Sequence, residues 1–165
     1  MAHQNLNDIH TIVVHCSATE ENMDFDAEDI RRWHTAPKPE GRGWSDIGYH
    51  GVILLDGSWE PGRPFTRRGA HVAGNNMNTL GFVLIGGLAA QTRKPKNTFN
   101  YDQFNMLQRQ IFEAKKKCIN IKHVRGHRSY SPDLNGDGII TPNEWIKQCP
   151  CFSVSQFMEK RRIVL

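Results

Sequence analysis

The chain has 165 residues, of which 38% are hydrophobic, and a formal net charge of +4 at pH 7. This predicts a single domain over residues 1–165 with an ordinary core, and no apolar run is long enough to cross a bilayer. The four cysteines are too few and too unevenly spaced for a disulfide scaffold. The charge fits an acidic partner such as nucleic acid or bacterial cell wall. The basic residues are scattered, however, so nucleic acid is not the expected partner.

The first predicted element, within residues 12–19, is a buried strand that ends in a loop, because a β-branched run precedes small polar residues. It places His15 at the carboxyl end of a strand, where open α/β sheets carry their sites. A helix should follow through Ala27 and Ile30, capped by Asp24 or Asp26. Prolines at positions 37 and 39 end that helix.

A second strand is predicted over residues 46–55, with a hairpin turn at residues 56–57 and a return strand from residue 58. Tyr49 and His50 should face opposite sides of this strand. Trp44 precedes it in a glycine-rich loop, where it is either a buried anchor or an aromatic facing the substrate. The sequence leaves both interpretations of Trp44 open.

Residues 69–78 are rich in glycine and asparagine, a composition typical of exposed turns suited to holding a polar ligand. Residues 80–87 are nearly all apolar and predict a central strand covered on both faces. Apolar residues at steps of three and four predict a helix over residues 104–118, then a strand over 119–124. We interpret His123 in this strand as a bystander. A last short helix is expected over residues 154–160, capped by Ser153 or Ser155.

Residues 133–144 match the pattern of an EF-hand calcium loop at every specified position. That chemistry needs oxygen ligands on alternate residues, a glycine to turn the chain and a closing glutamate. No long helix precedes the segment, so a metal-free loop of Asx turns is the alternative. If calcium binds, its role would be structural, setting the distance from His127 to Cys149. The calcium ligands would be Asp133, Asn135, Asp137, Ile139 and Glu144.

Residues far apart in the sequence supply a set of zinc ligands. His15 and His127 offer two imidazoles, and the segment at residues 149–151 offers a thiolate. In an extended segment Cys149 and Cys151 would face opposite ways, so one can bind the metal while the other packs. Three such ligands leave a fourth zinc position for water.

Short motifs that occur in one order resemble a known family. They are residues 14–19 (VHCSAT), 30–34 (IRRWH), 46–50 (DIGYH), 69–71 (GAH), 85–87 (IGG), 126–127 (GH) and 147–150 (KQCP). The chain is similar to the zinc-dependent N-acetylmuramoyl-L-alanine amidases of the phage T7 lysozyme type, which share their fold with peptidoglycan recognition proteins. The resemblance runs from about residue 10 to about residue 157. The acidic insert is a departure, because the T7-type protein has a short loop there.

The resemblance implies an α/β fold with a central mixed sheet flanked by helices and a groove that carries one zinc ion. It implies zinc ligands at His15, His127 and Cys149. Tyr49 and Lys147 would be the catalytic pair beside the metal. His71, Asn76 and Asn78 would line the groove and bind substrate.

The implied reaction is hydrolysis of the amide between N-acetylmuramic acid and L-alanine of the stem peptide. Zinc would lower the pKa of its bound water and polarise the carbonyl. Tyr49 would orient or deprotonate the water, and Lys147 would stabilise the oxyanion. Two rivals are a recognition module that binds muropeptides without cutting them and a regulator of a phage RNA polymerase. Non-catalytic family members typically lack the cysteine ligand, so Cys149 favours the enzyme.

The polar residues 1–8 lack the apolar region of a signal peptide. We therefore expect a protein made in the cytoplasm that reaches the cell wall by release or by another export route. We expect it to be a monomer with peptidoglycan as its partner and without a membrane span.

Overall fold

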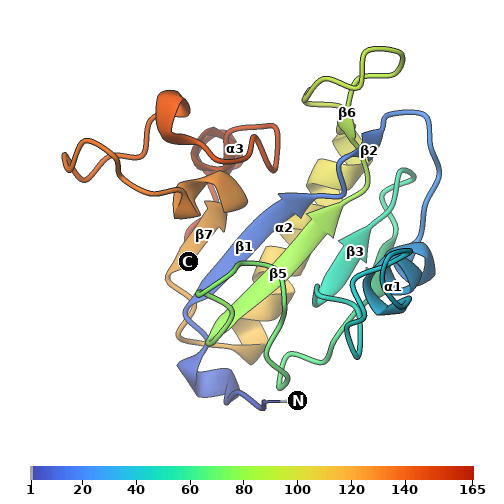
Figure 1. Ribbon diagram of the computed structural model, residues 1–165. Coiled ribbons are helices and arrows are strands. Elements are labelled where there is room, and N and C mark those ends of the chain that lie inside the picture. Colours follow the sequence, from blue (N-terminus) through green and yellow to red (C-terminus); the bar gives the residue numbers. More distant parts are fainter. Residues whose placement is uncertain (1) are drawn as a thin grey trace.

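The computed structural model describes residues 2–165 and contains a five-stranded mixed sheet with helices on both sides (Figure 1). The strands are β1 (Thr11–Cys16), β2 (Thr19–Glu20), β3 (Gly51–Ile53), β4 (Trp59–Pro61), β5 (Thr79–Leu84), β6 (Gly87–Leu88) and β7 (His123–Gly126). The α-helices are α1 (Ala27–Thr35), α2 (Tyr101–Lys117) and α3 (Val154–Lys160). Short 3-10 turns are η1 (Leu6–Asp8), η2 (His127–Tyr130) and η3 (Pro142–Glu144). This confirms the predicted fold class.

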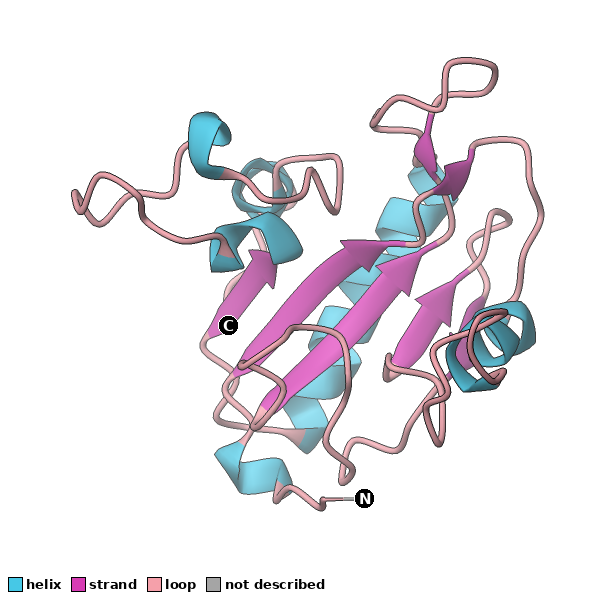
Figure 2. Cartoon of the chain, in the orientation of Figure 1, coloured by secondary structure: helices cyan, strands magenta, loops and turns pink. Residues whose placement is uncertain are grey.

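The sheet has the order β4-β3-β5-β1-β7, and only the β3–β4 hairpin is antiparallel. β5 and β1 lie at the centre, and every residue of both strands is buried, as predicted for the apolar run from residue 80. Because neighbouring strands run in parallel, the carboxyl ends of β3, β5, β1 and β7 meet at one edge of the sheet (Figure 2). β2 and β6 form a separate parallel pair beyond this edge.

The side chains of β1 alternate between the two faces of the sheet. Ile12, Val14 and Cys16 belong to the main core, which they share with Leu107 and Ile111 of α2. α2 runs behind the sheet and covers this face (Figure 1). The alternation turns His15 to the opposite face, where the loops lie. His15 and Cys16 therefore lie on opposite faces of the sheet.

The helices follow the local signals that predicted them. Asp26 caps α1 by accepting a hydrogen bond from the Asp29 backbone, and the Asp29 side chain caps in return. Ser153 caps α3 by accepting from the Gln156 backbone. These two caps resolve the alternatives that the sequence left open. Within residues 2–165, no helix combines the length and the apolarity that a membrane span requires.

The strand predicted over residues 46–55 is wrong in its first half, because only Gly51–Ile53 pair as β3. The backbone before β3 is held by a side chain instead of a neighbouring strand. The Arg63 guanidinium donates to the carbonyl oxygens of Ile47 and Asp46. Arg63 is itself buried, so these hydrogen bonds also provide acceptors for its buried N–H groups. Residues 46–50 consequently form an irregular segment beside the sheet.

The strand predicted over residues 119–124 also begins later, because β7 starts at His123. The chain turns after α2, where the Lys115 ammonium donates to the carbonyls of Ile119 and Ile121. Pairing with β1 then begins at Thr11 opposite His123. His123 is exposed and stays outside the candidate metal centre, as predicted.

Candidate metal centre

The register between β1 and β7 brings the first two candidate ligands together. The strands pair in parallel with Val14 opposite Gly126, so His15 and His127 follow at neighbouring positions. Their imidazole centroids are 4.7 Å apart. His15 is buried, whereas His127 is half-buried and starts the turn η2. The pairing of two strands thus joins residues that lie far apart in the sequence.

Cys149 reaches this pair through contacts at the end of β7. A side chain at Gly126 would place its Cβ 2.8 Å from Cδ of Pro150, so glycine is needed for Pro150 to lie this close. The Arg128 backbone N–H donates to the Cys149 carbonyl at 2.9 Å. The Cys149 sulfur lies 3.8 Å from Nδ1 of His15 and accepts a hydrogen bond from the Cys16 backbone N–H. The insert before Cys149 therefore leaves the ligand in position.

Within residues 2–165, His15, His127 and Cys149 are the one group of three or more candidate ligand side chains whose donor atoms converge; these atoms lie within 4.8 Å of one another. Burial lowers the pKa of His127 to about 4, and burial also lowers the pKa of His15 well below its usual value. Both imidazoles are therefore neutral at pH 7, the form that binds a metal. Two neutral imidazoles and one thiolate are a donor set that fits zinc.

His71 lies beneath the metal centre and contacts a ligand directly. Its Nδ1 is 3.1 Å from Nε2 of His15, and its Nε2 is 3.4 Å from the Thr79 hydroxyl. The Thr79 hydroxyl in turn donates to the Asn75 carbonyl at 2.9 Å. His71 is buried, and burial holds its pKa well below the usual value. A chain of hydrogen bonds thus runs from His15 to the backbone of the loop.

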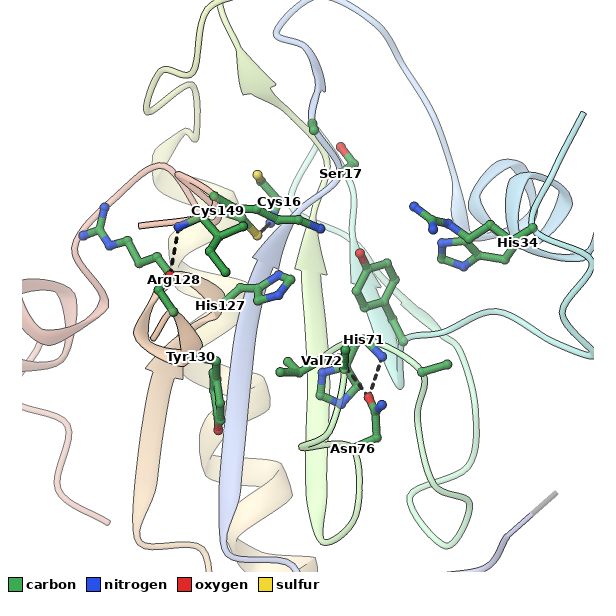
Figure 3. Close-up of a pocket in the computed structure, with 18 of the residues that line it drawn as sticks. Cys16, Ser17, His34, His71, Val72, Asn76, His127, Arg128, Tyr130 and Cys149 are labelled. Carbon is green, nitrogen blue, oxygen red and sulfur yellow. Dashed lines mark hydrogen bonds between the residues drawn. The ribbon is translucent and has the colours of Figure 1, made fainter. Parts of the chain in front are cut away.

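The Asn76 side chain builds the wall of the groove around His71. Its amide oxygen accepts from the backbone N–H groups of His71 and Val72 at 2.7 and 2.8 Å (Figure 3). Asn76 lines the groove, as the resemblance implies. Asn78 does not: its backbone pairs with Gln4 and His10 where β5 begins, at the other end of that strand.

A groove of about 620 Å³ opens over the centre and contains both expected catalytic residues. Tyr49 and Lys147 line it together with His127 and Cys149, whereas His15 lies below its surface. The Tyr49 ring centroid is 5.1 Å from that of His15. Burial, together with Cys149 and Cys16, raises the pKa of the Tyr49 phenol, so its hydroxyl stays protonated at neutral pH. Lys147 is exposed and lines the same groove.

Trp44 lines the same groove and is half-buried, so it serves as an anchor and also faces the cavity. Its ring lies against the His34 imidazole, with centroids 4.8 Å apart. The His34 Nδ1 accepts from the Gly48 backbone at 3.0 Å. Burial lowers the pKa of His34 to about 4, so this imidazole is neutral. The remaining ring nitrogen of His34 therefore carries its proton.

Sequence reasoning assigned no role to several residues that line the groove. His34 lies in one of the motifs that carry the resemblance, and this motif could have indicated that His34 belongs to the site. Arg128 directly follows a predicted ligand, but nothing local indicates that it faces the cavity. The residues missed are His34, Arg42, Arg128 and Tyr130.

The acidic segment 133–144 lies beyond β7, outside the sheet (Figure 1). Its carboxylates accept hydrogen bonds from its own backbone: Asp133 from Gly136 and Gly138, and Glu144 from Leu134 and Thr141. Glu144 is buried by these contacts. Asn135 and Asp137 each accept a hydrogen bond from the backbone N–H two residues on, which forms Asx turns. An EF-hand helix pair is not formed, because η3 is the one helical turn within the segment.

The carboxyl ends of the strands thus carry a His–His–Cys group that could hold one metal ion beneath a groove, a donor set that hydrolytic zinc sites use. No family model matches the chain. The endolysin of Klebsiella phage KP32 is 33% identical over 153 residues, covering 93% of this chain and 87% of that protein. The endolysin of Escherichia phage T7 is 30% identical over 157 residues, with coverages of 93% and 87%. The chain belongs to the family of T7-type endolysins.

Solved structures share this fold. The N-acetylmuramoyl-L-alanine amidase LysC from Clostridium intestinale superposes with a TM-score of 0.70 at 22% identity, covering 99% of this chain and 92% of that one. The complex of peptidoglycan recognition proteins LCa and LCx with tracheal cytotoxin gives 0.68 at 22% identity, with coverages of 97% and 86%. At this identity the likeness concerns the fold, and it confirms the fold that the motifs implied.

Proposed function

We propose that this protein is a zinc-dependent N-acetylmuramoyl-L-alanine amidase, which hydrolyses the amide between N-acetylmuramic acid and L-alanine in peptidoglycan. The observation that carries the proposal is the convergence of His15, His127 and Cys149 at the floor of a groove, in a chain that belongs to an endolysin family. We infer that it acts on the cell wall as a monomer.

Zinc bound by these three residues would lower the pKa of its bound water and polarise the scissile carbonyl. The other roles fall to groove residues. The protonated Tyr49 hydroxyl can orient the attacking water by hydrogen bonding. The Lys147 ammonium, which also lines the groove, can stabilise negative charge on the carbonyl oxygen as it develops. Asn76 and Trp44 shape the walls between which the glycan and peptide would lie.

The amidase proposal is tested by digesting purified peptidoglycan with the zinc-loaded protein and analysing the products by mass spectrometry. We expect free stem peptides with L-alanine at their amino terminus and glycan strands that keep intact lactyl groups. A protein that binds peptidoglycan and releases no peptide would be the recognition module instead. Cleavage between sugars or within the stem peptide would contradict the assigned bond.

His71 is proposed to position His15 for the metal. If His15 binds through Nδ1, which faces Cys149, its Nε2–H can donate to His71 and fix the ring. His71→Ala should therefore lower zinc affinity about 10- to 100-fold, the range typical of such partners. Competition with a chromogenic chelator measures this. His71→Gln, which offers an acceptor oxygen, should restore part of the affinity. Unchanged affinity in the folded alanine variant would exclude this role.

Calcium binding by the acidic segment stays a prediction of the sequence. Calcium should raise the melting temperature in a saturable titration, because a bound ion stabilises the folded state. Glu144→Gln should blunt the rise, since the glutamate closes the predicted loop. Magnesium at equal ionic strength is the control. A melting temperature that calcium leaves unchanged would assign the segment to the metal-free alternative.

A further inference from the structure

Two thiols that the metal centre does not use lie against each other behind it. Cys16, at the end of β1, and Cys151 have their sulfur atoms 3.7 Å apart. Cys16 is buried in the core that faces α2, and Cys151 is half-buried and packs against the same core. Neither belongs to the group of converging ligand atoms. The pair therefore needs an explanation other than zinc binding.

The backbone around the pair is arranged to leave room for both sulfur atoms. A side chain at Gly87 would place its Cβ 2.9 Å from the Cys16 sulfur and 3.6 Å from the Cys151 sulfur. Cys151 itself has a φ of 70°, in the left-handed region that residues with a side chain rarely adopt. The two sulfur atoms thus lie opposite each other against the main core.

We propose that Cys16 and Cys151 are a disulfide-forming pair, oxidised by exchange with a disulfide such as oxidised glutathione. The sulfur atoms need to approach from 3.7 Å to about 2 Å to form the bond. The bond would connect the strand that carries His15 to the segment that carries Cys149. The Cys149 thiolate takes no part, so all three metal ligands remain.

The exchange proceeds in two balanced steps. The Cys151 thiolate, the more accessible of the two, attacks one sulfur of oxidised glutathione and releases one reduced glutathione. The Cys16 thiolate then attacks the Cys151 sulfur of this mixed disulfide and releases the second. The protein loses two thiol protons and two electrons, and glutathione disulfide is reduced to two thiols. Cys16 is buried and Cys151 half-buried, so access for glutathione is limited and hours of incubation are needed.

The cross-link would join residues 135 positions apart. Closing so long a loop removes many conformations from the unfolded chain, and this stabilises the folded state. We therefore expect the oxidised protein to melt about 5 °C or more above the reduced protein. Dithiothreitol should reverse the shift. Because the readouts are covalent mass and melting temperature, this inference stands or falls separately from the proposed amidase function.

The experiment treats the zinc-loaded full chain with excess oxidised glutathione, blocks remaining thiols and measures the mass. Relative to the reduced protein, we expect two fewer blocking groups, a further loss of about 2 Da, no bound glutathione and unchanged zinc content. Trypsin should yield residues 1–31 linked to residues 148–160, and fragmentation between Cys149 and Pro150 should place the link on Cys151. Cys151→Ser is the matched control; it should keep zinc and show neither the link nor the shift in melting temperature.

Three outcomes would overturn the proposal. One is a link that maps to Cys149 with loss of zinc, which would make oxidation an attack on the metal centre. Another is stable glutathione on Cys151 that Cys16 never displaces. The third is a melting temperature that rises equally in the Cys151→Ser variant.

Discussion

Replacing Cys149 by alanine is expected to abolish zinc retention and amidase activity together. The sulfur is the one anionic donor of the set, and its removal leaves two neutral imidazoles, His15 and His127. Activity should fall by more than the roughly 100-fold that loss of an outer hydrogen-bond partner can cost. Zinc content after dialysis and the rate of peptide release from peptidoglycan measure the two losses.

The matched control for Cys149→Ala is Cys151→Ser, which removes the neighbouring thiol and should keep one zinc per chain. Circular dichroism should show that both variants remain folded, because Cys149 is only half-buried and contributes little to the core. A Cys149→Ala protein that is free of zinc yet still active would refute the ligand set. If zinc were lost in Cys151→Ser instead, the thiolate would have been assigned to the wrong cysteine.

Tyr49→Phe is expected to lower kcat by about 100-fold or more while zinc content stays the same. The substitution removes one oxygen atom and keeps the ring that packs 5.1 Å from the His15 centroid. The metal ligands and the groove wall are therefore undisturbed, so the loss reports on the hydroxyl itself. Steady-state kinetics on a soluble muropeptide separate kcat from KM.

The control for this experiment is Tyr101→Phe, because Tyr101 is exposed at the start of α2, away from the groove. It should leave both kinetic constants unchanged. Retained turnover in Tyr49→Phe would remove the phenol from the mechanism. A rise in KM alone would instead make Tyr49 a residue that binds substrate.

Local signals predicted those parts of the fold that depend on neighbours in the sequence. Asp26 and Ser153 cap helices within the next three residues, and the apolar spacing along α2 is a property of one segment. The irregular segment before β3 could not be predicted this way. Its backbone is satisfied by Arg63, a residue 16 positions beyond Ile47, and nothing near Ile47 indicates that bond.

In the candidate site, too, some residues could be predicted from the sequence, whereas contacts that depend on the folded chain could not. His15, His127 and Cys149 could be proposed because their types and motifs indicate a metal site, and the structure brings them together. His71 was expected to line the groove, and it does, but its contact with His15 depends on how the loop folds over β5. His34 depends likewise on where α1 lies beside the segment at Gly48.

The pairing of β7 with β1 also governs when the protein can become active during synthesis. The strand that supplies His15 is made first, yet its partner strand and the cysteine arrive only after more than a hundred further residues. A nascent chain still attached to the ribosome short of residue 149 has no sulfur to complete the centre. The metal centre can therefore form only after synthesis has reached Cys149.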